Sequence, residues 1–310
     1  MIRKPMDVLE QFPIRKTKTQ KSEFIETVTD YAGKLGYPVT VEAEKRGVRN
    51  IVIGKPDAAR YLITAHYDTP ASIGLPNFIA PNNPLCFFGI QFALIAVMLA
   101  VSSAVGFGVY WICGNERIGF LAGYFFYFAI LILMLKGPAN RSNANDNTSG
   151  VVTVLKTLTE LPEELRDRVC FVLFDMEEAG LVGSAAYRKR HKEASENQWV
   201  LNLDCVGDGD IIQLTPVKKG RQDALLLERL SRICGKAGDK ELRLRSKGFY
   251  KGSSDHKNFP KGVAIMAFRY KKGIGLYCGR IHTWRDKILD ETNTSLLCEK
   301  LIAFVADNQE

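Results

Sequence analysis

NDNTSGVVTVLKTLTELPEELRDRVCFVLFDMEEAGLVGSAAYRKRHKE, residues 145–193, alternates between two hydrophobic periods. GVVTVLKTLTEL (150–161) spaces its apolar residues as a helix does, and GLVGSAAYRKRHKE (180–193) returns to that spacing. Between them, RVCFVLFDMEE (168–178) carries a continuous apolar run that is typical of a buried strand. A buried strand between two helices predicts a sheet that helices cover on both faces.

The same alternation runs through most of the chain. Further strands are predicted at 38–45, 49–54, 60–68, 199–210, 210–217 and 262–270, and further helices at 21–36, at 223–238 and from about Thr294. The predicted fold class is therefore α/β, a three-layer α/β/α sandwich with a mostly parallel or mixed central sheet. In such sheets, ligands bind at the carboxyl ends of the strands.

One region interrupts this alternation. Between Pro84 and Lys136 the only charged residues are Glu116 and Arg117, and they separate two apolar runs. A helix of about 20 apolar residues spans the roughly 30 Å of bilayer hydrocarbon, so the runs, about 85–113 and 118–135, predict a transmembrane helical hairpin. The alternative is a soluble helical insertion buried against the domain, but two uncharged neighbouring stretches leave no polar face for water.

The hairpin defines the predicted domain organisation. Residues 1–75 and 137–310 form one discontinuous domain, and residues 76–136 form an inserted linker and hairpin. Because a two-pass hairpin returns the chain to the side that it left, both parts of the domain share a compartment. Lys136 and Arg141 favour the cytoplasm for that compartment.

Composition limits the compartment and the partners. The net charge of +8 suits an anionic membrane surface or an acidic partner, and the lipid bilayer is the predicted partner of the hairpin. The chain has no arginine-rich arm or RNA-binding aromatic pattern, so nucleic acid is not an expected partner. Seven cysteines without a CxxC pair indicate reduced thiols, and the N-terminus lacks the apolar segment of a secretory signal. The oligomeric state stays undetermined.

Polar side chains that can carry chemistry occur at the ends of predicted strands or in the loops after them. Histidine and carboxylate are the ligands of hydrolytic zinc, and a two-metal site needs about two terminal ligands per metal and a bridging carboxylate. The chain has four histidines, so two at such positions are informative. The predicted ligands of two Zn²⁺ ions are His66, Asp146, Glu178, Asp204 and His282. Glu177 would then be the general base, and Asp68 would orient His66.

The ordered set H-x-D, NDNTSG, E-E, N-x-D, S-D-H and H-T resembles the zinc-dependent exopeptidase family of the bacterial leucyl aminopeptidases, glutamate carboxypeptidase II and glutaminyl cyclase. The resemblance covers roughly 15–75 and 137–305. It implies that His66 and Asp204 hold one zinc, that Glu178 and His282 hold the other, and that Asp146 bridges them. It also implies a cis peptide bond between Asp146 and Asn147.

The motif Ser254-Asp255-His256 matches a family sequence near the substrate pocket. Asp255 and His256 are therefore expected to shape the substrate site rather than to bind zinc, because the ligand count is complete without them. Arg280 is a further candidate for substrate binding.

The resemblance implies hydrolysis of a peptide substrate, most simply as an aminopeptidase. A carboxypeptidase or dipeptidase would need a cation for the substrate carboxylate, for which Arg280, Arg285 and Lys271 are candidates. A glutaminyl cyclase is less favoured, because it typically needs one zinc and this chain keeps ligands for two. A catalytically inactive membrane scaffold, as in the transferrin-receptor branch, would have lost ligands, whereas this chain keeps all five.

The sequence departs from the soluble aminopeptidases between Asp68 and Asp146, where 77 residues replace a short connection. Specificity cannot be transferred across that difference. Because Asp146 follows Lys136 by ten residues, which reach at most about 33–36 Å, the active site is expected near the cytoplasmic membrane face.

Overall fold

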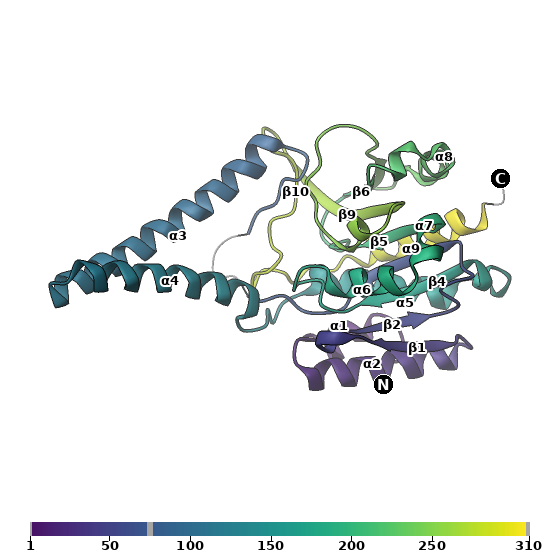
Figure 1. Cartoon of the computed structure of the whole chain (residues 1–310). Coiled ribbons are helices and arrows are strands. Elements are labelled where there is room, and N and C mark those ends of the chain that lie inside the picture. The colour runs from purple at the N-terminus through teal and green to yellow at the C-terminus, as the bar shows by residue number, and fades with distance from the viewer. Residues whose placement is uncertain (1, 73–76, 308–310) are drawn as a thin grey trace.

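The computed structural model describes residues 2–72 and 77–307. The predicted boundary between residues 75 and 76 lies outside the described residues. Within them, the predicted α/β sandwich is confirmed, and a hairpin of two long helices projects from it (Figure 1).

The sheet is mixed, with the strand order β1-β2-β4-β3-β5-β9-β6-β8-β7, and β10 pairs with β9. Strands β4, β3, β5 and β9 are parallel neighbours, and β1, β2, β6, β7 and β10 each have an antiparallel partner. The bounds are β1 Val39–Ala43, β2 Arg49–Ile53, β3 Tyr61–His66, β4 Val169–Phe174, β5 Trp199–Leu203, β6 Ile211–Pro216, β7 Gly235–Ala237, β8 Lys240–Leu244, β9 Gly262–Lys271 and β10 Gly275–Tyr277.

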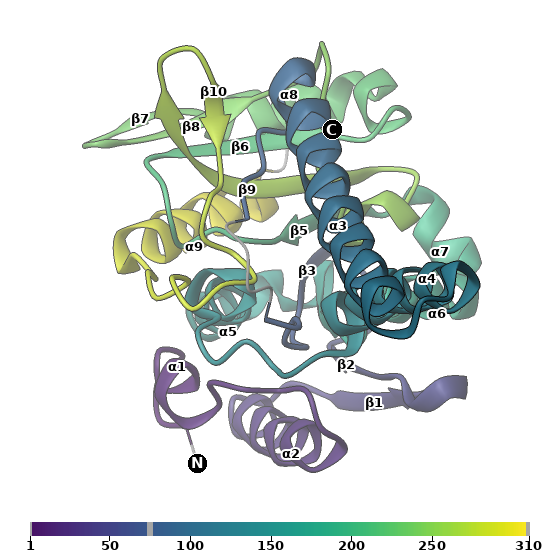
Figure 2. The ribbon, with the colours of Figure 1, turned by 90° about the vertical axis from the view of Figure 1, so that its left-hand side faces the viewer.

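Helices lie on both faces of this sheet (Figure 2). Their bounds are α1 Asp7–Gln11, α2 Lys18–Lys34, α5 Gly150–Glu160, α6 Val182–Arg190, α7 Lys192–Asn197, α8 Ala224–Ile233 and α9 Glu291–Ala306. Short 3₁₀ segments occur at Lys45–Gly47, Glu163–Arg168, Gly220–Gln222 and Asp255–Asn258. Ala144–Ser149 forms a kinked turn whose backbone is non-helical at Asp146 and Asn147.

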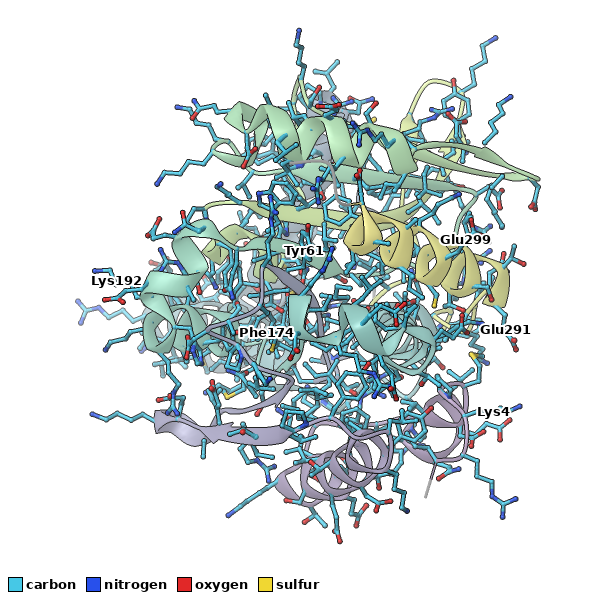
Figure 3. All side chains as sticks on the ribbon, turned by 90° about the vertical axis from the view of Figure 1, so that its right-hand side faces the viewer. Lys4, Tyr61, Phe174, Lys192, Glu291 and Glu299 are labelled. Atoms are coloured by element: carbon cyan, nitrogen blue, oxygen red, sulfur yellow. The ribbon has the colours of Figure 1, made fainter. Side chains whose placement is uncertain are left out.

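The core follows from the alternation of side chains along the central strands. In β4, Phe171 belongs to the larger hydrophobic cluster, which includes residues of α2, α5, α8 and α9. Val172 and Phe174 belong to a second cluster with Tyr187 of α6. Because successive residues of a strand point to opposite faces, a continuous apolar strand fills both clusters. Figure 3 shows Tyr61 and Phe174 inside the domain and charged residues such as Lys192 at its surface.

Several element boundaries differ from the sequence prediction. The predicted helix 223–238 ends at Ile233, and Gly235 enters β7 with a φ of 143° that suits glycine. The predicted helix 21–36 begins three residues earlier, at Lys18, because Thr17 and Gln20 form a capping box. The last helix begins at Glu291 rather than near Thr294, since the Asp290 carboxylate accepts a hydrogen bond from Thr292 N–H.

The hairpin helices are α3, Pro84–Cys113, and α4, Glu116–Lys136, close to the predicted spans. Both are long and apolar enough to cross a membrane. In each, only 11% of the most apolar window is buried, which distinguishes them from the core helices of the domain.

The two hairpin helices touch through small residues. A Cβ added at Gly106 would lie 2.8 Å from the carbonyl oxygen of Gly119, and one added at Gly123 would lie 2.7 Å from that of Ser102. Backbone approaches this close require the absence of a larger side chain. From this contact the helices separate toward the domain (Figure 1).

Candidate metal centre

Three neighbouring parallel strands bring part of the predicted site together. His66 is the last residue of β3, Asp204 directly follows β5, and Glu177 and Glu178 lie in the loop after β4. Strand β3 lies between β4 and β5 and is parallel to both, so these loops meet at one edge of the sheet. This is the edge at which a sheet of this type binds ligands.

Asp146 and His282 reach the same place from other segments. Asp146 lies in the turn that leads into α5, so it follows α4 and not a strand, which corrects the sequence prediction. The peptide bond between Asp146 and Asn147 is cis, as the resemblance implies. His282 lies between β10 and α9 with a positive φ of 59°.

The two oxygens of Asp146 lie near different histidines. Asp146 Oδ1 is 3.4 Å from His66 Nε2, which is in turn 3.7 Å from Asp204 Oδ1. Asp146 Oδ2 is 3.0 Å from His282 Nε2, which is 3.7 Å from Glu178 Oε2. The donor atoms therefore form two groups that share Asp146, and in each group they lie within 4.8 Å of one another. His66, Glu177 and Glu178 form a third such group.

These donors have the chemistry of a zinc site. Glu178 Oε1 is buried without a hydrogen-bond partner among the described residues, as suits an oxygen that binds a metal ion. Burial and the neighbouring Asp146 carboxylate raise the pKa of Glu178 to about 8, although His282 opposes this shift. A bound cation would offset the electrostatic repulsion between these neighbouring carboxylates. Imidazole and carboxylate are also the ligands that zinc prefers in hydrolytic sites. The residues present thus fit the zinc that the resemblance implies.

Asp68 holds the loop that carries both glutamates. Its Oδ1 accepts a hydrogen bond from the backbone N–H of Glu177 at 3.0 Å, and its Oδ2 accepts one from that of Glu178 at 3.2 Å. Its Oδ1 also lies 3.4 Å from His66 Nδ1, on the ring side away from Asp146. Burial opposes ionisation of Asp68, but these partners outweigh it and its pKa is lowered. Asp68 thus positions one candidate ligand and the candidate base together.

The sequence predicts three further residues at the substrate site, Asp255, His256 and Arg280. Asp255 is buried and accepts a hydrogen bond from the Ser184 hydroxyl, and burial raises its pKa to about 7. His256 is also buried, and burial lowers its pKa to about 3. Arg280 pairs with Asp208 at 3.2 Å. None of Asp255, His256 and Arg280 belongs to the described residues that line the cavity at the donor groups.

The two alternative cations, Arg285 and Lys271, are exposed, and Arg285 lies over the ring of Trp284. Neither is among the described residues that line that cavity.

Two positioning residues were not predicted. The buried Asp286 carboxylate accepts hydrogen bonds from the backbone N–H groups of Asn145 at 2.8 Å and Asp146 at 2.9 Å. The fully buried Arg15 guanidinium donates to the carbonyl of Tyr67 and the hydroxyl of Thr148, so it joins the loops that follow His66 and Asp146. Asp286 could have been suspected from the sequence, because it lies four residues after the candidate ligand His282. No pattern in the sequence indicated a role for Arg15.

The fold and the donor groups fit the class of α/β zinc peptidases, and comparison with known proteins agrees. The sequence profile of peptidase family M28 matches residues 134–303, more than half of the chain. The chain belongs to this family, and it is a zinc metallopeptidase. No curated protein sequence matches the chain.

Solved structures share the fold at low sequence identity. Glutaminyl cyclase from Porphyromonas gingivalis superposes with a TM-score of 0.57 at 16% identity, covering 95% of this chain and 92% of that one. A Zn-dependent exopeptidase from Parabacteroides distasonis gives 0.57 at 12% identity, with coverages of 96% and 94%. The LapA aminopeptidase of Legionella pneumophila gives 0.56 at 16% identity, with coverages of 97% and 70%. Since these proteins differ in reaction, the likeness identifies the fold and not the substrate.

Proposed function

We propose that the chain is a membrane-anchored aminopeptidase that binds two zinc ions. The position of Asp146 supports this most directly, because its two oxygens lie nearest to two different histidines, His66 and His282. A carboxylate that offers one oxygen to each of two donor groups is what a two-metal site requires of its bridge. We assign His66 and Asp204 to one zinc, and Glu178 and His282 to the other.

Glu177 is the proposed general base. The chemistry that zinc supplies in such a site is Lewis acidity, which polarises a carbonyl group and lowers the pKa of water. Glu177 lines the same cavity as His66 and His282, and Asp68 fixes its backbone. Its carboxylate accepts a proton from the attacking water as the new C–O bond forms, and then gives that proton to the departing amine as the C–N bond breaks.

The cations near the cavity bear on which end of a peptide is cleaved. A carboxypeptidase needs a cation for the terminal carboxylate of its substrate, whereas an aminopeptidase needs none there. Arg280, the predicted candidate for that cation, is paired with Asp208. Lys251 does line the cavity, and it is the observation that favours a carboxypeptidase or dipeptidase as the second candidate.

The hairpin is the proposed anchor. We propose a catalytic domain of residues 1–75 and 137–310 and an inserted linker and hairpin of residues 76–136. The exposure of apolar side chains along both helices supports insertion in lipid, because water would not tolerate so large an apolar surface. Lys136 is the last residue of the second helix and Arg141 follows it by five residues, and both favour a cytoplasmic position for the domain.

Peptide digestion tests the reaction. Zinc-loaded protein in detergent is expected to contain about two zinc ions per chain and to shorten a peptide library from the amino end, which mass spectrometry measures. Shortening from the carboxyl end would favour the second candidate. Intact peptides in the presence of two bound zinc ions would contradict both candidates.

Two variants test the residue roles. Glu177→Gln is expected to retain both zinc ions and to lose about two to four orders of magnitude in kcat, because a neutral amide accepts no proton. Asp146→Ala is expected to lose metal, since both donor groups share that carboxylate. Zinc content and kcat are measured on the same preparations, with Asp167→Ala, an exposed site, as the control. Near-normal turnover of Glu177→Gln would refute its role as base.

A further inference from the structure

The hairpin contributes to the cavity that contains the candidate metal centre. This cavity has a volume of about 480 Å³ and is lined by the donor residues His66, Asp146, Glu177, Glu178, Asp204 and His282. Phe87 and Gln91 of α3 and Leu135 of α4 line the same cavity. Ile79, next to the hairpin, and Ile281 add further apolar surface. Residues of the proposed anchor therefore form part of the lining of the candidate active site.

The two hairpin helices are attached at separate places around this cavity. At the base of α3, Phe87 and Phe88 pack against Phe249, and the Asn83 side chain donates to the carbonyl of Ile274. After α4, the carbonyl of Pro138 accepts a hydrogen bond from Ser72 N–H, in the segment that follows β3. One helix is thus fixed to the β9–β10 side of the domain and the other to the β3 side. The separation of the helices in Figure 1 follows from these attachments.

The depth of these residues follows from the helix rise. About 20 residues at 1.5 Å each cross roughly 30 Å of hydrocarbon. Counted from the hairpin turn, that distance reaches about Leu94 in α3 and about Leu135 in α4. Leu135 therefore lies at the near boundary of the hydrocarbon, and Phe87 and Gln91 lie just outside it. A peptide bound in the cavity would meet apolar side chains at the level of the lipid head groups.

We infer that the base of the hairpin forms the specificity wall of the active site, and that Phe87 and Leu135 select peptides whose first residue is large and apolar. This inference rests on the proposed aminopeptidase activity and names its substrate class. Leu135 is 67% exposed, so a substrate side chain can cover it and remove apolar surface from water. Lys251, also in the lining, disfavours a cationic first residue.

Aminoacyl coumarin amides of Leu, Ala and Lys test the selection on the full chain in detergent. Apolar pockets separate side chains that differ by one or more methylene groups by about 10- to 200-fold, so the wild type is expected to prefer Leu over Ala within that range. In Phe87→Ala and in Leu135→Ala, the ratio of kcat/KM for Leu over Ala is expected to fall at least about tenfold, mainly through KM.

Matched controls lie on the same helices. Phe92 and Leu133 are 70% and 58% exposed and are not among the described residues that line the cavity. Phe92→Ala and Leu133→Ala are expected to keep the wild-type ratio within about twofold. Equal zinc content in all four variants shows that the metal centre is retained.

Photo-crosslinking gives a measurement that does not depend on turnover. A short peptide that begins with p-benzoylphenylalanine is irradiated with the Glu177→Gln variant, and the labelled residues are identified by mass spectrometry. Crosslinks at Phe87, Gln91 or Leu135 support the inference, whereas crosslinks confined to other regions would overturn it.

The kinetic outcomes separate the two proposals. If the wild type cleaves the amides but Phe87→Ala and Leu135→Ala both keep its ratio, the inference fails and the aminopeptidase proposal stands. If zinc-loaded wild type cleaves none of the amides, both fail.

Discussion

At the scale of single residues, the candidate centre depends on carboxylates that bind backbone as much as on those that face the cavity. Asp68 holds the N–H groups of Glu177 and Glu178, and Asp286 holds those of Asn145 and Asp146. Each carboxylate accepts hydrogen bonds from two backbone N–H groups in a loop that carries a candidate ligand. These hydrogen bonds fix the backbone of each loop, while the candidate ligand side chains point to the metal site.

Asp286 gives a residue-scale prediction. In Asp286→Asn, one oxygen can still accept a hydrogen bond, but the new amide N–H₂ faces a backbone donor. We expect the zinc affinity to fall about 10- to 100-fold and the free energy of unfolding to fall by about 1–3 kcal/mol.

Competition with a zinc-binding dye measures the affinity, and chemical denaturation in detergent measures the stability. Asp167→Asn is the control, because that side chain is 83% exposed and pairs only at the surface with Lys55. Wild-type zinc affinity in Asp286→Asn would show that Asp286 does not position the bridging segment.

At the scale of elements, the hairpin is held by backbone contact between its helices. Ser102 and Gly106 on α3 meet Gly123 and Gly119 on α4, and both pairs have the four-residue spacing that puts them on one helix face. This spacing is visible in the sequence, but it does not reveal which faces meet. The contact lies near the hairpin turn, so it leaves the bases of the helices free to diverge around the cavity.

Gly119 gives an element-scale prediction. A Cβ at Gly119 would lie 2.7 Å from both the Gly106 carbonyl oxygen and Tyr110 Cβ, so Gly119→Val must push the helices apart. Overpacking of this kind costs about 1–3 kcal/mol, which thermal unfolding in detergent measures as a lower Tm. Gly108→Val on α3 is the control, because a Cβ there would have nothing within 4 Å. Equal Tm values for the two variants would contradict the packing.

At the scale of the whole molecule, the proposed anchor would place the peptidase domain against a membrane surface. The domain is basic, with a net charge of +8 for the chain, and its candidate centre opens beside the two helix bases. If the helices cross the bilayer, the cavity faces the head-group region. Substrates would then be found among peptides that already lie at the membrane surface.

Orientation is the whole-molecule prediction. Cys113 is exposed at the end of α3, beside the hairpin turn. In vesicles whose cytoplasmic face points inward, a membrane-impermeant maleimide added outside is expected to label Cys113. The control is Asp167→Cys in a Cys113→Ser background, which is expected to react only after permeabilisation, because residue 167 lies in the catalytic domain. The reverse pattern would contradict the cytoplasmic orientation.

The sequence by itself determined the order of the central strands and the longer helices, the two apolar spans and the residue types of a zinc site, although it did not predict β7, β8 or β10. These properties are encoded locally, because hydrophobic period and side-chain chemistry can be read from neighbouring residues. It misplaced the end of the helix after Ile233, where glycine and a partner strand override the helical pattern. It also grouped Asp146 with residues at strand ends or in the loops after strands, although Asp146 follows α4.

Only the tertiary structure decided which of those residues contact one another. Three features join residues that are far apart in the chain. The metal-binding donors form two groups around Asp146, and Asp286 and Arg15 bind the loops that carry candidate ligands. Phe87 and Leu135 of the hairpin line the cavity. The tertiary structure also paired Arg280 with Asp208, a contact that the sequence did not predict. Such contacts depend on strand order and on where each helix is attached, and no local pattern records either.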